Sequence, residues 1–508
     1  TTKTSQNTSQ IFPMETEVPH SPSSALAGYL QAFQRAPDAP FLRYYTPDPP
    51  GGEGGPNHRV PGAKVSWATY SRRQLWELAL RCAGACRARG LGPGDTVALF
   101  FTGNRVEDLA MRLAAAMLGV VPVTVNWQAD TLERVIYKIQ MTRARLVLTD
   151  AGVTEDQIAR LRAELPQTEL LPSDRLHAAP LLPVKFMATD LPLGTDRIII
   201  FTSGTTGEPK GVQLSYAAYE CSRGTFEQFL DFEPKSKLVA VVTNPMHHTN
   251  STAITDWALR RPNTELYLLD RYCTDYWAVL TSAAAGLSLE VVLQGEESRI
   301  AEAVLERKNE GVRVVAPLVS KHFDFLATLM EPPPAETAAV GHSKPPPRLW
   351  SQACLSACLK SSNVILLLGS APVGPTTVER LHKYAGRLPT VRFGSTETCL
   401  QVVGTPLGLS EEARLLAFQR GWKHMYRGEP QPGYYIGRPH PPFTEALIVR
   451  STDKASENYL VECDAGEPGF LVTRGRNLMT CYVNNPEATF EAIDAESGGG
   501  DINLRGMC

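Results

Sequence analysis

One stretch, residues 198–212, constrains this chain more than any other, and it reads IIIFTSGTTGEPKGV. It starts with four apolar residues typical of a short buried strand, and a second apolar stretch begins where it ends. Between the two lies a loop rich in hydroxyl groups and glycine. Because glycine has no Cβ, the backbone of such a loop can wrap closely around an anion and point consecutive N–H groups at it. The sequence therefore predicts a phosphate-binding loop made of Thr202, Ser203, Gly204, Thr205, Thr206, Gly207 and Lys210.

This loop is not a Walker A motif. That motif reads GxxxxGK[ST], whereas only two residues separate Gly204 from Gly207. A simpler interpretation is a polar turn that joins two strands. Lys210 favours phosphate binding, because its ammonium group is a point charge suited to phosphate. Other motifs in the chain are needed to decide between a phosphate-binding loop and a polar turn.

The composition excludes several classes of protein. Apolar residues make up 43% and charged residues 20% of the 508 residues, which is typical of soluble globular proteins. The net charge of -3 gives no electrostatic reason to expect binding to nucleic acid or to an anionic membrane. The longest apolar run, residues 113–123, is too short for a transmembrane helix. We expect a protein of the cytoplasm or of an organelle.

The ten cysteines are scattered along the chain. Cys82 and Cys86, and likewise Cys354 and Cys358, are four residues apart, but neither pair is completed to a zinc pattern. We therefore expect structural cysteines in a reducing compartment.

Strands and helices alternate along most of the chain. From residue 96 to 148 a strand, a helix, a strand, a helix and a strand follow one another, which predicts a doubly wound parallel sheet. A second alternation has expected strands at residues 238–243, 264–269, 289–293, 312–316 and 364–368. We predict an α/β fold with two doubly wound α/β subdomains and a small β-rich subdomain with a hinge region, covering residues 1–190, 191–430 and 431–508.

A second motif, residues 391–398, reads VRFGSTET. A strand ends at Phe393, turns at Gly394, and is followed by Ser395, Thr396 and Glu397. An aromatic face can stack on a base, a hydroxyl group can donate to phosphate, and a carboxylate suits Mg²⁺. The alternative is a core aromatic residue followed by a surface carboxylate.

The two motifs together resemble those of the adenylate-forming (AMP-binding) superfamily of acyl-CoA synthetases, peptide-synthetase adenylation domains and luciferases. The loop is similar to the AMP-binding signature, and residues 393–397 are similar to the motif YGxTE. Residues 245–248 resemble the segment PxxH beside the acyl and thiol channels, with His248 at its last position. The resemblance extends over about residues 20–490, and it includes the adenine-pocket segment GGAP at Gly369, Ser370, Ala371 and Pro372.

This resemblance implies an AMP-forming acid–thiol ligase. A carboxylic acid, with a fatty acid as the first expectation, would react with ATP to give an acyl-adenylate and then with coenzyme A to give a thioester. It implies catalytic roles for Lys210, Thr396, Glu397 and His248, with Glu397 as the Mg²⁺ ligand. The expected nucleotide site comprises the loop, the segment 369–372 and residues 393–396. The expected ligands are ATP, Mg²⁺, coenzyme A and a small carboxylic acid.

The end of the chain departs from the family. The family has a Gly-Asp pair whose Asp holds the ribose, and here Asp501 in the stretch GGGDIN is the candidate, unless that stretch is a low-complexity tail. The family then continues with a C-terminal lid domain that supplies a lysine, and we expect this chain to lack that domain.

Two other functions stay open. One is an amino-acid adenylation domain, although residues 247–250 read HHTN where such domains carry an Asp for the ammonium group. The other is a nucleotide-binding protein with impaired catalysis.

Overall fold

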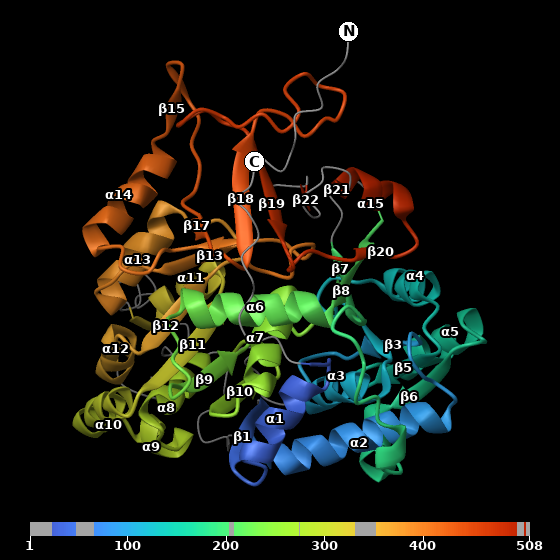
Figure 1. The fold of residues 1–508 in the computed structure, drawn as a ribbon. Helices are drawn as coiled ribbons and strands as arrows, with labels where there is room; N and C mark the ends of the chain where they lie inside the picture. Colours follow the sequence, from blue (N-terminus) through green and yellow to red (C-terminus); the bar gives the residue numbers. More distant parts are fainter. Residues whose placement is uncertain are drawn as a thin grey trace, which may run out of the picture.

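The computed structural model describes residues 23–46, 66–202, 208–273, 275–330, 352–494 and 502–503. Two large sheets form the body of the molecule, and a small antiparallel sheet stands above them (Figure 1). The predicted α/β fold with two doubly wound units and a β-rich unit is confirmed. Within the described ranges no helix is both long and apolar enough to cross a membrane. The predicted cytoplasmic or organellar location stays a prediction.

The first large sheet has seven strands in the order β20-β8-β7-β4-β3-β5-β6. Five of them run parallel: β3 (Thr96–Phe100), β4 (Val121–Thr124), β5 (Leu146–Thr149), β6 (Glu169–Pro172) and β7 (Asp196–Thr202). Antiparallel strands extend it on one side: β8 (Lys210–Ser215) and β20 (Cys481–Tyr482).

Helices cover both faces of this sheet because its strands are apolar on both sides. Val97 and Leu99 pack in one core with α2 (Arg72–Ala88) and α3 (Val106–Leu118). Ala98 and Phe100 pack in another core with α4 (Leu132–Thr142) and α5 (Glu155–Glu164). The start of α2 is a capping box, since Gln74 N donates to Ser71 Oγ at 3.2 Å and Ser71 N donates to Gln74 Oε1 at 2.8 Å.

The second large sheet has nine strands in the order β17-β14-β13-β12-β11-β9-β10-β1-β2. Its parallel strands are β1 (Pro40–Thr46), β9 (Lys237–Val242), β10 (Thr264–Leu269), β11 (Val312–Leu318), β12 (Val364–Leu368) and β13 (Thr390–Phe393). Antiparallel strands lie at its edges: β2 (Ser66–Ser71), β14 (Val403–Gly404) and β17 (Arg438–Pro439).

Here too the strand residues alternate between two cores. Leu238, Ala240 and Val242 of β9 pack in the core that holds the central helices of Figure 1, α6 (Tyr216–Phe229) and α7 (Thr249–Arg260). Val239 and Val241 pack on the opposite side. The helices on that side are α8 (Tyr276–Ala285), α10 (Glu297–Asn309), α11 (Ser320–Met330), α12 (Gln352–Lys360) and α13 (Pro375–Ala385).

The strand predicted at residues 289–293 is wrong, because the structure has the short helix α9 (Leu289–Gln294) there. Ser288 caps this helix, with its hydroxyl oxygen accepting from Val291 N at 3.4 Å. Gly295, with φ of 78°, ends it in the left-handed conformation. A short apolar run does not by itself distinguish a strand from a buried helix.

Each large sheet contains strands from both sides of residue 190. The hairpin of β1 and β2 lies in the nine-stranded sheet, whereas β7 and β8 lie in the seven-stranded sheet. The subdomain ranges 1–190, 191–430 and 431–508 stay a prediction.

A buried group of charges connects β7 with α1 (Ala27–Arg35), α6 and α7. Arg197 of β7 and Arg260 of α7 both pair with Asp256, at 2.7 and 3.0 Å. Arg260 also pairs with Glu220 of α6 at 3.0 Å, and Tyr29 of α1 donates to Asp256. All are buried, so the strand that leads to the loop is held by fully desolvated ion pairs.

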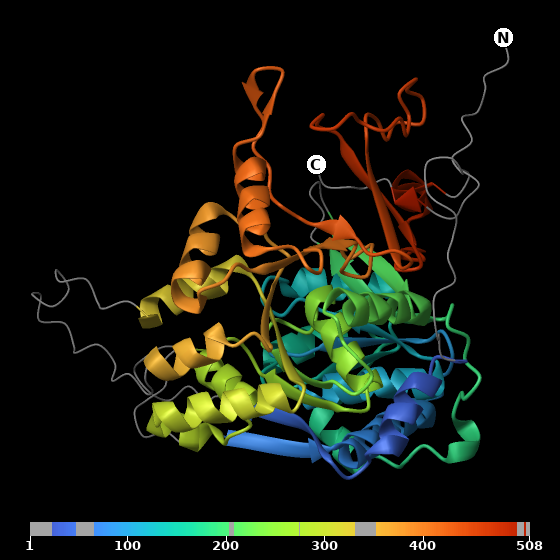
Figure 2. The ribbon, with the colours of Figure 1, turned by 60° about the vertical axis from the view of Figure 1, so that its left-hand side comes forward.

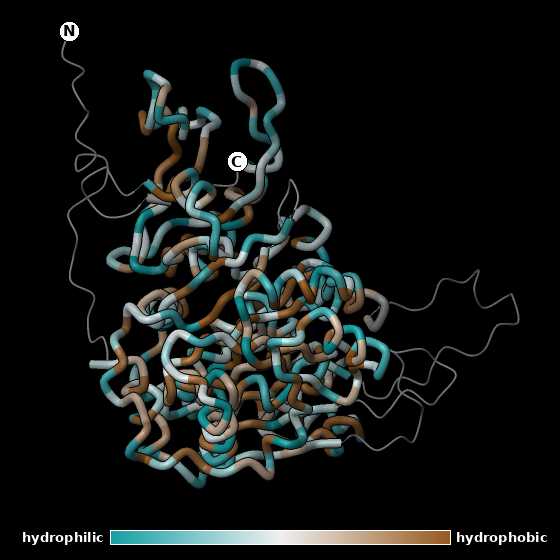
Figure 3. The backbone as a smooth tube through the Cα atoms, turned by 90° about the vertical axis from the view of Figure 1, so that its right-hand side faces the viewer, coloured by the Kyte–Doolittle hydropathy of each residue, from teal (hydrophilic) through white to brown (hydrophobic). Residues whose placement is uncertain are grey.

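The small sheet has the order β18-β19-β22-β21 and stands apart from the large sheets in Figure 2. Its strands are β18 (Thr444–Val449), β19 (Phe470–Gly475), β21 (Ile493–Asp494) and β22 (Ile502–Asn503). Nearby elements are α14 (Glu411–Trp422), α15 (Pro486–Ala492) and the projecting hairpin of β15 (Met425–Tyr426) and β16 (Glu429–Pro430). In Figure 3 apolar segments run through the lower body of the molecule, as its large cores require.

Candidate active site

Lys210, Tyr482 and Glu397 meet at the edge of the seven-stranded sheet. Tyr482 pairs with Val212 in the β8–β20 ladder, which brings it close to Lys210 at the start of β8. The Lys210 ammonium lies 5.3 Å from the centre of the Tyr482 ring. The Tyr482 hydroxyl group donates to Glu397 Oε1 at 2.7 Å. A cation and a carboxylate from distant motifs therefore flank one buried phenol.

The predicted loop lies between β7 and β8, an antiparallel pair. Thr202 and Lys210, the residues at its two ends, stand opposite each other in that pair. Ser203, Gly204, Thr205, Thr206 and Gly207 lie outside the described residues, as does Asp501. The structure thus describes the ends of the loop but neither its tip nor the candidate ribose ligand.

The motif around Glu397 is a tight, internally bonded turn. A Cβ on Gly394 would lie 1.8 Å from the carbonyl oxygen of Leu400, so only glycine fits there. Ser395 N donates to Thr398 Oγ1 at 2.9 Å, and Leu400 N donates to Ser395 O at 2.9 Å. Met479 N donates to the carbonyl oxygen of Glu397 at 2.7 Å. The turn places Thr396 and Glu397 at fixed, half-buried positions.

The two candidate adenine segments follow adjacent strands. Parallel strands β12 and β13 pair with Leu368 opposite Val391, so Gly369 to Pro372 and Phe393 to Ser395 leave the same edge of the sheet. Ligands of open α/β sheets bind at the carboxyl ends of strands, where these segments lie. Ser370 is exposed and has φ of 65° at a position where the family segment has glycine.

His248 and its neighbour His247 precede α7. His248 is exposed, whereas His247 is only 5% exposed, and the two rings are 4.3 Å apart. Burial lowers the pKa of His247 to about 2, and nearby His248, Lys138 and Arg112 contribute. Neither ring nitrogen of His247 has a hydrogen-bond partner among the described residues.

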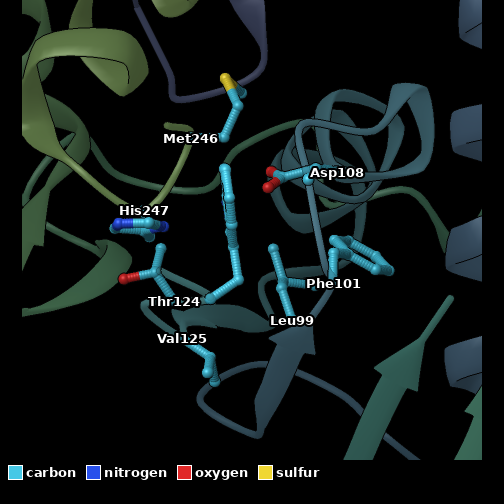
Figure 4. Close-up of a pocket in the computed structure, with 9 residues that line it drawn as sticks. Leu99, Phe101, Asp108, Thr124, Val125, Met246 and His247 are labelled. Atoms are coloured by element: carbon cyan, nitrogen blue, oxygen red, sulfur yellow. The ribbon is translucent and has the colours of Figure 1, made fainter. Parts of the chain in front are cut away.

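His247 faces a small cavity between the two large sheets (Figure 4). The cavity has a volume of about 10 Å³, and one water needs about this much room. The buried indole nitrogen of Trp127 also lacks a partner within the described ranges. The cavity is lined by Leu99, Phe101, Gly103, Asp108, Thr124, Val125, Trp127, Met246 and His247.

The residues at Tyr482 fit the nucleotide and metal that the sequence predicts. Mg²⁺ is usually held by one or two carboxylates together with substrate phosphates, and Glu397 can supply one carboxylate. In the described part of the chain no three His, Cys, Asp or Glu side chains form a self-sufficient metal site. Lys210 on the other side of the phenol suits phosphate.

The model of the AMP-binding enzyme family matches residues 32–483. The chain belongs to this family. A 2-succinylbenzoate–CoA ligase of Bacillus licheniformis is 25% identical over 422 residues, which are 83% of this chain and 69% of that protein. The long-chain-fatty-acid–CoA ligase FadD13 of Mycobacterium tuberculosis is 28% identical over 220 residues, and the match spans 42% of each protein.

A solved structure shares the fold of this chain. The o-succinylbenzoate coenzyme A synthetase of Bacillus subtilis, in complex with ATP and magnesium, matches with a TM-score of 0.61 and 18% identity. The match covers 94% of this chain and 75% of that one. The family predicted from the two motifs is therefore confirmed, and with it the enzyme class of AMP-forming acid–CoA ligases.

Sequence reasoning missed three residues of this family member's candidate site. Tyr482 belongs to neither motif, and its place between Lys210 and Glu397 depends on a strand pairing that a motif does not reveal. Asn250 and Arg392 stand inside quoted motifs without an assigned role. Arg392 gave a signal in the sequence, since an arginine between Val391 and Phe393 in an expected strand is unusual.

Proposed function

We propose that this chain activates a carboxylic acid with ATP and transfers the acyl group to coenzyme A. In the first step a carboxylate oxygen attacks the α-phosphorus of ATP, the bond to the β-phosphate breaks, and acyl-adenylate and pyrophosphate form. In the second step the thiol sulfur of coenzyme A attacks the acyl carbon and AMP leaves. The observation that carries the proposal is the meeting of Lys210 and Glu397 at Tyr482.

The residues have distinct roles in this proposal. Lys210, with Thr202 and the loop from Ser203 to Gly207, binds the β- and γ-phosphates and offsets their charge. Thr396 donates to a phosphate oxygen. Glu397 would hold Mg²⁺, which would neutralise charge on the phosphates. Tyr482 orients the Glu397 carboxylate through its 2.7 Å hydrogen bond.

Adenine would lie against Phe393 and the segment Gly369 to Pro372, with Gly394 and Ser395 shaping the pocket. Asp501 would hold the ribose. His248, exposed at the start of α7, would border the path of the acyl group or the thiol. The solved relative bound to ATP and magnesium supports this choice of ligands.

Acid-dependent exchange between ATP and pyrophosphate tests the first step directly. We expect exchange with at least one acid of a panel from acetate to long-chain and aromatic acids. Lys210→Ala should weaken ATP binding about 10- to 100-fold, the effect of one charge-assisted hydrogen bond. The matched control is Lys235→Ala, because the Lys235 side chain is 88% exposed and pairs only with Glu233 in the described part of the chain. ATP binding that is equal in both variants contradicts the assigned phosphate site.

A further inference from the structure

Arg392 is a buried cation with no acidic partner among the described residues. Its side chain belongs to β13 and is 3% exposed. Among the described residues its guanidinium forms no ion pair, and Nε and Nη1 have no hydrogen-bond partner. Burial alone lowers its pKa to about 9. A buried charge is usually paired, because desolvation without a partner costs several kcal/mol.

The guanidinium points at the start of helix α7. Its Nη2 donates to Asn250 Oδ1, in the first turn of that helix. Asn250 Nδ2 in turn donates to Ser370 Oγ at 3.4 Å. The N-terminus of a helix carries partial positive charge and favours anions. A full positive charge and a helix N-terminus therefore face the same small region, and neither is neutralised by a described carboxylate.

The backbone makes room for this side chain. A Cβ on Gly369 would lie 3.0 Å from Arg392 Cγ, so the glycine at the end of β12 lets the arginine pass over it. Gly369 also begins the segment beside the candidate nucleotide site. Arg392 thus reaches the region next to that site and not a remote part of the core.

Strand geometry separates this region from the nucleotide. Successive side chains of a strand point to opposite faces of the sheet, so Arg392 and Phe393 face opposite ways. Phe393 is the candidate adenine neighbour, whereas Arg392 faces α7. Arg392 and Asn250 therefore lie beside the candidate adenine segment, on the other face of β13 from Phe393.

We propose that the acid substrate carries a second carboxylate, which Arg392 binds together with Asn250 at the start of α7. This inference rests on the proposed function and names the substrate class of the same site. One carboxylate is activated by ATP, and the other forms a bidentate pair with the guanidinium, whose planar fork fits it. The tail of a simple fatty acid would leave the charge buried and unpaired. The ammonium group of an amino acid would be repelled.

The test compares acids of equal carbon number. Exchange between ATP and pyrophosphate is measured with succinate and butyrate, glutarate and pentanoate, adipate and hexanoate, and phthalate and benzoate. We expect the best dicarboxylate to exceed its monocarboxylate partner about 100-fold in kcat/KM, because a site with buried donors rejects a ligand that leaves them unpaired. In a parallel arm, calorimetry measures binding of the same dicarboxylates in the presence of an ATP analogue with a methylene group between the α- and β-phosphates.

Three variants identify the site. Arg392→Leu should remove the preference for the dicarboxylate, and the fold should persist because an unpaired buried charge is replaced by an apolar side chain. Asn250→Asp places a carboxylate against Arg392 and should also lower dicarboxylate binding about 100-fold while leaving the guanidinium in place. Arg392→Lys keeps the charge but loses the planar guanidinium. Its preference for the dicarboxylate should lie between those of the wild type and Arg392→Leu.

The outcomes separate the two proposals. Equal or better exchange with monocarboxylates in the wild type overturns the inference and leaves the proposed function standing. Exchange with no acid at all contradicts the proposed function, and calorimetry then decides the inference alone. Dicarboxylate binding that Arg392→Leu abolishes supports it. No dicarboxylate binding, or binding that Arg392→Leu leaves unchanged, overturns it.

Discussion

At the scale of single residues, Tyr482 links the two motifs that the sequence identifies. Its ring lies under the Lys210 ammonium and its hydroxyl group donates to Glu397. Its side chain is 1% exposed, and the pairing of β8 with β20 holds it in place. A side chain in this place can keep a carboxylate and a cation in register without contacting the substrate.

Replacing Tyr482 with phenylalanine tests this role. Tyr482→Phe keeps the ring beside Lys210 but removes the hydrogen bond to Glu397, so the carboxylate is less well oriented. We expect acid-dependent exchange between ATP and pyrophosphate to fall about 10-fold and the free energy of unfolding to fall by about 1 kcal/mol. Exchange kinetics and denaturant unfolding measure the two effects.

Tyr459 provides a matched control. Its hydroxyl group also donates to a carboxylate, that of Asp494, but in the small β-rich sheet. Tyr459→Phe should lower the free energy of unfolding by a similar amount and leave exchange unchanged. If the two variants lose exchange equally, Tyr482 has no role beyond stability.

The sequence predicted the residue types at the site better than the contacts that hold them in place. Lys210 and Glu397 were found because their neighbours form motifs within a few residues. Tyr482 contacts both from a strand more than eighty residues beyond Glu397, and such pairing over a long sequence distance leaves no local pattern. Arg392 was visible as a residue type, but only the structure shows that it is buried beside Asn250.

At the scale of elements, the turn after β13 depends on one glycine. Gly394→Ala would push a methyl group against the carbonyl oxygen of Leu400, at 1.8 Å, and a backbone atom does not yield as a flexible side chain does. The turn must then move, and Thr396 and Glu397 move with it. We expect a loss of about 1–3 kcal/mol in the free energy of unfolding and a fall in exchange of more than about 100-fold.

The same measurements on Gly194→Ala provide the control. A Cβ at Gly194 meets no atom within 4 Å, and this glycine precedes β7 in an exposed loop. The control should be neutral or slightly stabilising, because alanine restricts the unfolded chain. An active and stable Gly394→Ala variant would show that the turn does not constrain the candidate site.

Elements were predicted well where their pattern was long or had marked ends. Helices α2 and α3 have long apolar faces, and the capping box of α2 is visible as Ser71 and Gln74. Helix α9 was missed because a run of five apolar and acidic residues is too short to show whether the hydrophobic pattern has the period of a helix or of a strand. Its cap, Ser288, and its final Gly295 were the better signals. Local patterns also do not say to which sheet a strand belongs, as β1 and β2 demonstrate.

At the scale of the whole molecule, three buried histidines make folding dependent on pH. Burial lowers the pKa of His247 to about 2 and those of His322 and His440 to about 4. His322 Nδ1 accepts from Val319 N at 3.2 Å. His440 Nε2 accepts from the amide nitrogen of Gln401 at 3.0 Å. Protonation at either nitrogen would replace an acceptor with a second donor, so the folded state requires the neutral ring.

The sign of the effect follows from these depressed values. In the unfolded chain a histidine takes up a proton near pH 6.5, whereas in the folded protein it does so only near pH 4 or below. The stabilisation is therefore complete above pH 6.5 and is lost as the pH falls from 6.5 toward 4. Each residue should cost about 2 kcal/mol between pH 7 and pH 5, and typical domains are stable by about 5–15 kcal/mol. We expect the denaturant midpoint to fall steeply over this range.

Two variants that keep the acceptor but do not titrate can attribute this acid sensitivity. In His322→Asn the amide oxygen can take the place of Nδ1 and accept from Val319 N, and in His440→Gln the amide oxygen can take the place of Nε2 beside Gln401. Each variant should flatten the dependence of the free energy of unfolding on pH by about 2 kcal/mol between pH 7 and pH 5. The double variant should flatten it by about twice that, because His322 packs against Tyr276 in one core, His440 packs against Phe229 in another, and the two share no hydrogen bond. Denaturant titrations at half-unit pH steps measure the slope. A double variant as acid-sensitive as the wild type between pH 7 and pH 5 would contradict the assignment to these two histidines. The carboxylate of Asp256 cannot replace them as the cause, because its pKa is lowered and it loses its charge only below about pH 4.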